Sequence, residues 1–223
     1  MATKQNAINR KTQDLTIDPG VAGDSALQFD INGTGEFRIG VDDDASDAFK
    51  ISQGSALGTT DTFVMTAAGE RTMPLQPAFL AHLASNDNNR VGQNPYNIGT
   101  NVAYTEIYDQ NADFNTNGTF TASITGRYLF YASIKIGEIT AGMRTSQVQM
   151  LTSNRNYESQ LRSAGVIRDS SNIASWVAEA IADMDAADTA ILNMYISGGV
   201  TDTADILGQA TNPITYFGGC LIV

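Results

Sequence analysis

Hydrophobic and polar residues alternate along much of this chain with the two-residue period of β-strands. Positions 27–31 and 37–41 carry apolar residues at every second position, and Asn32-Gly33 lies between them. Asn-Gly between two alternating segments is a strong local signal of a β-hairpin. We therefore expect an antiparallel hairpin, followed by short strands near 48–52 and 62–66.

The strongest strand pattern in the chain is Gly126–Ile136, which is rich in aromatic and β-branched residues. Further strand patterns recur at intervals of about 10–20 residues with turn residues between them, which is typical of an antiparallel sandwich or barrel. They lie at 79–83, 102–108, 146–151 and 190–197. The final apolar run, Ile214–Val223, is also expected to pair within a sheet, because fraying would expose it to water.

The segment Asn172–Met184 fits two periods. Its many alanines favour a helix, with Val177 and Ile181 on one face, whereas alternation from Trp176 onward favours a strand. We expect a strand because the flanking segments are strands.

Composition and prolines divide the chain into three parts. Residues 1–13 are polar and predict an attachment arm that orders on a partner. Residues 14–76 have few large apolar groups for their length and predict a thin, β-rich stalk that would gain stability from packing several copies together. Pro74 and Pro77 cannot donate ladder hydrogen bonds and mark a boundary, so 77–223 is expected to be the larger head.

Bulk properties exclude several classes of protein. The 223 residues are 42% hydrophobic with net charge −11, which supports a packed core and argues against a nucleic-acid partner. No apolar run approaches the roughly 18 residues of a membrane span, and the N-terminus has no apolar core of a signal peptide. We therefore expect no membrane insertion. One cysteine and one histidine rule out an internal disulfide and the usual zinc sites.

An ordered set of motifs in 77–223 resembles the C1q/tumour-necrosis-factor jelly-roll family. It departs from the family pattern at Ala187, where a glycine is usual. The motifs are Pro77–Ala81, Phe114, Gly118–Thr121, Gly126–Phe130, Ala186–Ala190 and Thr215–Ile222. The resemblance implies an all-β, antiparallel jelly-roll head that forms a homotrimer and binds rather than catalyses. It also implies that a set of aromatic residues lies in the core or trimer interface, two locations that sequence does not separate: Phe79, Phe120, Tyr128, Phe130, Tyr216 and Phe217.

The preceding segments Gly35–Asp42 and Phe49–Thr59 are similar to stretches of bacteriophage tail-fibre and other virion-fibre proteins. There a short β-rich stalk precedes a terminal head. This resemblance implies a virion-surface location, with the arm bound to other virion proteins and the head bound to a host glycan or protein.

Candidate chemistry is sparse. The run Asp42-Asp43-Asp44 with Asp47 offers carboxylates for calcium, although such runs are more often solvated loops. Asp30–Val41 begins like an EF-hand loop but lacks its final glutamate, so the hairpin interpretation is preferred. His82 lies in a predicted strand without a nucleophile elbow nearby, and Cys220 is expected to be a buried, inert thiol. We expect no catalytic residues and no cofactor.

The sequence therefore predicts a non-enzymatic, trimeric surface fibre of a bacteriophage, located on the tail or the capsid. Two alternatives stay open. A C1q-like bacterial carbohydrate- or protein-binding module would carry a signal peptide or a collagen-like stalk. A tail-spike glycan hydrolase would carry a long β-helix.

Overall fold

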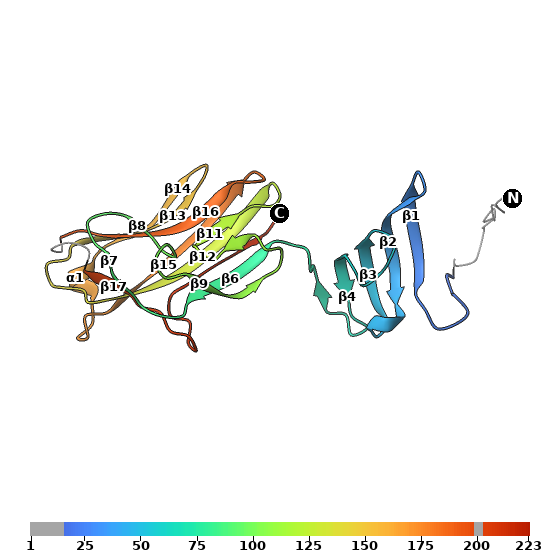
Figure 1. The fold of residues 1–223 in the computed structure, drawn as a ribbon, viewed down its shortest axis with the longest axis horizontal. Helices are drawn as coiled ribbons and strands as arrows, with labels where there is room; N and C mark the ends of the chain where they lie inside the picture. The colour runs from blue at the N-terminus through green and yellow to red at the C-terminus, as the bar shows by residue number, and fades with distance from the viewer. Residues whose placement is uncertain (1–15, 199–202) are drawn as a thin grey trace. The chain divides into compact units, whose positions relative to one another are not determined.

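The computed structural model describes residues 16–198 and 203–223. These residues form two compact units, which divide between Leu75 and Gln76 (Figure 1). The division falls next to the prolines at 74 and 77. The proposed attachment arm, 1–13, lies outside the described residues. No helix in the described ranges is long and apolar enough to cross a membrane.

The N-terminal unit is one antiparallel sheet whose strands follow chain order (Figure 1). The predicted hairpin is confirmed: Asn32 and Gly33 at its turn both have positive φ, 53° and 79°, as a tight primed turn requires. The elements are β1 (Ser25–Ile31), β2 (Thr34–Asp42), η1 (Asp43–Ala45), β3 (Ala48–Gln53), β4 (Asp61–Met65) and β5 (Arg71–Thr72).

The C-terminal unit consists of two antiparallel sheets. One sheet holds β6 (Ala78–Leu83), β7 (Asp87–Val91), β9 (Tyr104–Asp109), β12 (Gly126–Gly137), β15 (Ala174–Met184), β17 (Ala204–Ile206) and β18 (Tyr216–Leu221). The other holds β8 (Tyr96–Asn97), β10 (Phe114–Asn115), β11 (Thr119–Thr121), β13 (Thr145–Thr152), β14 (Asn156–Ser163) and β16 (Thr189–Ile196). A short helix, α1 (Ala164–Ile167), follows β14.

The strand order of these sheets is that of a jelly roll. The principal strands, numbered 1 to 8 along the chain, are β6, β11, β12, β13, β14, β15, β16 and β18. One sheet then runs 1-8-3-6 and the other 2-7-4-5, the arrangement of two interlocked Greek keys. The expected all-β, antiparallel jelly roll is confirmed, and the C-terminal strand β18 lies between β6 and β12.

The ambiguous segment 172–184 is a strand. β15 pairs with β12 from Ala174 to Met184, and its burial alternates at every residue. Trp176 is fully buried and its indole N–H donates to Ser146 Oγ at 3.0 Å across the sandwich. Small alanines on the inward face leave room for the aromatic core, so tertiary packing overrides their helix propensity.

Aromatic rings from both sheets meet at the centre of this sandwich. Phe79 stacks on Phe114 and Phe120, with ring centroids 4.6 Å and 5.0 Å apart, and meets Phe217 edge-on at 5.1 Å. Phe79 and Phe217 belong to one sheet, and the other two rings belong to the opposite sheet. This cluster therefore holds the two layers together.

Candidate functional site

The aromatic residues predicted for the core or trimer interface divide between the interior of the sandwich and the outward side of one of its sheets. Phe79, Phe120, Tyr128, Phe130 and Phe217 are at most 1% exposed and lie in the core. Tyr216 is partly buried on the opposite face of β18 from Phe217. Neighbouring residues of a strand point to opposite sides, so these two aromatics cannot share one location.

Apolar and aromatic side chains gather on the outward face of the sheet formed by β9, β6, β18, β12 and β15, beside the charged Glu179, which faces Tyr131. We call this patch the tyrosine face and define it by six residues: Leu80, Tyr108, Leu129, Tyr131, Ile181 and Tyr216. The strand register places them on one side of the sheet. Leu80 is paired with Tyr108 in one neighbouring strand and with Gly218 in the other, and Gly218 is paired with Tyr131. Leu129 and Tyr216 each lie two residues from a member of this row, and Leu129 is paired with Ile181. Tyr108 is 44% exposed and Ile181 is 58% exposed, and the other four are partly buried. This face is the candidate functional site.

Tyr131 is the best-anchored side chain of the tyrosine face. Its ring lies over Gly218, where an added Cβ would come within 2.7 Å of the ring and its hydroxyl. Its hydroxyl is hydrogen-bonded to Tyr108, and its ring meets Tyr216 at a centroid distance of 6.5 Å and an angle of 64°. The glycine thus makes room for a tyrosine cluster spread over three strands.

Burial, followed by the hydrogen bond with Tyr108, raises the pKa of Tyr131 from 10.0 to about 12. Burial also raises the pKa of Tyr104 and Tyr128. Between pH 10 and about 12 the unfolded chain releases a proton that folded Tyr131 keeps, so stability falls as pH rises through this window. We expect Tyr131→Phe to flatten this fall in denaturant titrations. An unchanged pH slope in Tyr131→Phe would contradict the assignment.

Two adjacent glycines of β18 provide a test that separates the tyrosine face from the core. An added Cβ at Gly219 would lie 2.5 Å from a Phe130 ring atom, inside the core. We expect Gly219→Ala to cost about 1–3 kcal/mol of unfolding free energy by overpacking. Gly218→Ala should instead displace the Tyr131 ring into solvent at lower cost and lower its pKa. Denaturant unfolding and tyrosinate absorbance measure the two effects, and equal stability losses would count against this division.

His82 and Cys220 lie on the same side of the sheet as the tyrosine face. His82 faces Tyr216 in the neighbouring strand and is 5% exposed, and within the described part of the chain its Nδ1 has no hydrogen-bond partner. Cys220 faces Leu129 and is only partly buried, which corrects the expectation of a fully buried thiol.

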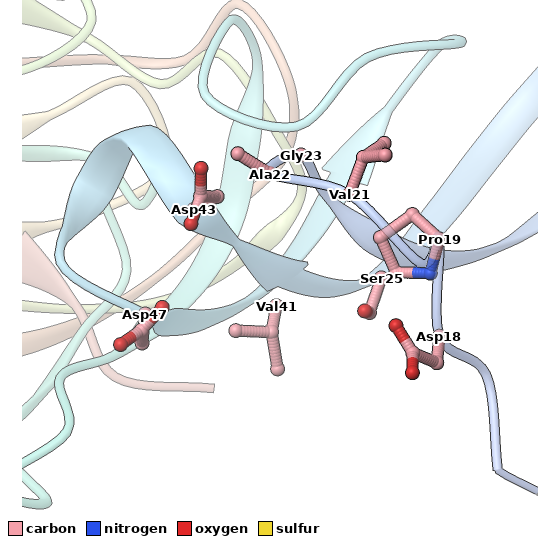
Figure 2. A pocket seen from close by; sticks show the side chains of 9 residues that line it. All are labelled: Asp18, Pro19, Val21, Ala22, Gly23, Ser25, Val41, Asp43 and Asp47. Carbon is pink, nitrogen blue, oxygen red and sulfur yellow. The ribbon is translucent and has the colours of Figure 1, made fainter.

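The aspartates considered for calcium do not act together. Asp42 is buried and bonded to Lys50 at 2.8 Å, whereas Asp43 and Asp44 lie in the exposed η1 turn. Asp43 and Asp47 border a shallow surface pocket with Asp18, and Figure 2 shows the three carboxylates pointing in different directions. Among the described residues, no group of three or more histidine, cysteine or acidic side chains could hold a metal ion. Asp43, Asp44 and Asp47 are exposed, as the solvated-loop interpretation expects, whereas Asp42 is buried.

The sequence contains a local signal for the tyrosine face. In the middle of β12 the outward positions Leu129 and Tyr131 are as apolar as the inward positions Tyr128 and Phe130, whereas the outward positions on either side of them are Arg127 and Ser133. A stretch of strand that is apolar on both sides is typical of burial on both faces. In this unit the described chain covers only one of them.

Comparisons with known proteins yield structural matches only. No protein-family model and no curated protein matches this sequence. Similar solved structures include the globular domain of zebrafish complement 1qA (15% identity, TM-score 0.42) and murine APRIL (12%, 0.44), which cover 66% of this chain and 98% and 99% of theirs. The Eiger TNF protein of S. frugiperda matches at 11% identity and TM-score 0.41, over 66% of this chain and 94% of its own. The strand order of the two sheets defines the jelly roll independently of these matches.

Proposed function

We propose that this protein is a non-enzymatic, homotrimeric surface fibre of a bacteriophage virion. Residues 1–13 attach it to other virion proteins, the N-terminal sheet forms a short stalk, and the jelly-roll head binds a host-surface glycan or protein. The tail and the capsid are both suitable locations for such a fibre.

The observation that carries the homotrimer is the tyrosine face. A contiguous set of tyrosine, leucine and isoleucine side chains lies on the outside of a sheet whose other side is already packed. Aromatic residues are enriched where protein surfaces bury one another, and closed cyclic symmetry lets identical copies cover such a face without leaving an open end. Three copies are proposed because the head has the jelly-roll strand order expected from the resemblance.

The fibre role rests on the order of the parts. The segments Gly35–Asp42 and Phe49–Thr59, which resemble virion-fibre stalks, form β2, β3 and the loop after it. They precede the jelly roll, as a stalk precedes a head. A bacterial C1q-like binding module would share the trimer but not the virion location.

The first experiment is the absolute mass of the purified protein by size-exclusion light scattering. Three copies of the 23.8-kDa chain give about 71 kDa, the expected result. A species of 23.8 kDa at micromolar concentration would overturn the trimer. Antibody labelling of purified virions then tests the location, and its absence from virions would favour the bacterial binding module.

A further inference from the structure

The sheet of the N-terminal unit has one face made almost entirely of apolar residues. We call it the open face and define it by six side chains of four adjacent strands: Leu27, Phe29, Phe37, Ile39, Ile51 and Phe63. The register aligns them, since Leu27 faces Ile39, Ile39 faces Ile51, Ile51 faces Phe63, and Phe29 faces Phe37. Directly opposed residues lie on the same side of an antiparallel pair. The open face therefore runs continuously across β1 to β4.

Within the described ranges, the chain covers the opposite, polar face of this sheet rather than the open face. Lys50 is 7% exposed and its Nζ lies 2.8 Å from Asp42 and 2.9 Å from Asp61. The loop between β3 and β4 folds over this side: Leu57 is 8% exposed, and Arg38 Nη1 donates to the Ser55 carbonyl at 3.0 Å. Folding of one chain thus buries an ion-pair cluster while apolar side chains on the other face remain in contact with water.

The exposed area of the open face is large for so small a unit. Phe29 is 51% exposed and Phe37 is 47% exposed, which leaves about 100 Å² on each, given the ~150–250 Å² that an aromatic side chain can bury. Leu27 at 45% and the adjoining Ile31 at 65% extend the patch to about 400 Å² in all, a size at which exposed apolar patches mark interaction sites. It amounts to about half of what one partner contributes to a standard interface.

We propose that the open face packs against the open faces of other copies of this chain, so that the N-terminal sheets assemble together with the heads. The inference rests on the proposed homotrimer. The chain carries a net charge of −11, so copies repel unless they meet through a neutral surface. The paired positions of the open face in β1 to β4 carry no charged residue, whereas the ion-pair cluster lies on the other side.

Tethering favours a second copy over a foreign partner. Only residues 73–77 separate the last strand of the N-terminal sheet from the first strand of the head. Once heads associate, such a short connection keeps the sheets of different copies at an effective concentration of about millimolar. Each added contact then forms without the full entropic cost of bimolecular association.

The test is site-specific photo-crosslinking of the full-length protein. Phe29→p-benzoylphenylalanine places an aromatic photoprobe on the open face in place of an aromatic residue, so the fold is preserved. The matched control is Thr72→p-benzoylphenylalanine, because Thr72 is exposed but aligns with Val64 and Lys50 on the other side of the sheet. After irradiation, denaturing electrophoresis should show chains linked in twos and threes for position 29, at least tenfold above position 72.

The outcomes separate this inference from the proposed trimer. A mass near 71 kDa with strong crosslinking at position 29 supports both. A mass near 71 kDa without crosslinking at position 29, or with equal crosslinking at both positions, overturns the inference and leaves the trimer standing. A mass of 23.8 kDa without crosslinks overturns both. Introducing Ile39→Asp beside the probe should reduce the crosslink at least tenfold, and a crosslink unaffected by this charge would also contradict the inference.

Discussion

Replacing Phe79 by alanine is expected to lower the free energy of unfolding by about 3–5 kcal/mol, a large part of the roughly 5–15 kcal/mol that stabilises a typical domain. Phe79 is 0% exposed and stacks on rings of the opposite sheet, Phe114 and Phe120. Truncation removes these contacts and opens a cavity between the two layers. Denaturant unfolding followed by circular dichroism, at one fixed chain concentration, measures the loss.

Two variants make the Phe79 test specific. Phe79→Leu keeps part of the volume and should cost less than Phe79→Ala. Ile124→Ala removes a side chain that is 47% exposed in the same unit, and we expect a change within about 0.5 kcal/mol. A Phe79→Ala loss no larger than that of Ile124→Ala would contradict the central place of this ring.

Placing a charge in the tyrosine face by Ile181→Asp is expected to convert the trimer into monomers. Ile181 is 58% exposed in the single chain, so aspartate there leaves the monomer fold intact. In a trimer, by contrast, three unpaired carboxylates would be buried, each at a cost of several kcal/mol. Size-exclusion light scattering should therefore report a shift from about 71 kDa to 23.8 kDa.

The control for Ile181→Asp is Val166→Asp. Val166 is 80% exposed and lies in α1, which follows β14 of the other sheet and contributes no residue to the tyrosine face. The same charge at that position should leave the mass at 71 kDa. If Ile181→Asp also remains trimeric, this part of the sheet is not an interface and the trimer must form through another surface.

The strands were predictable where the local pattern was unambiguous. Asn32-Gly33 between alternating segments is sufficient for a hairpin, because its positive φ angles and the matched twist of the strands are local properties. Gly126–Ile136 is likewise a strand by composition alone. In Asn172–Met184 local propensity and period disagree, and pairing with β12 decides the outcome.

The candidate site was less predictable than the fold. The six aromatic residues singled out from the sequence include only one, Tyr216, on the tyrosine face, since Phe217 and the others turn inward. Tyr131 was not singled out, although it follows Phe130 directly. A period of two shows that Tyr131 and Phe130 lie on opposite sides, but it does not say which side faces the second sheet.

The sequence by itself determined the all-β class, the hairpin, the strand at 126–136 and the alternating pattern of the N-terminal strands. These follow from backbone and side-chain preferences that act within a few residues. Only the tertiary structure decided which face of each sheet is covered. In the head, the second sheet buries Phe130 and leaves Tyr131 outside. In the N-terminal unit, the loop that contains Leu57 covers the side of the Lys50 ion pairs, and Phe29 and Phe37 remain exposed. Such choices depend on contacts between segments distant in sequence, which no local pattern records.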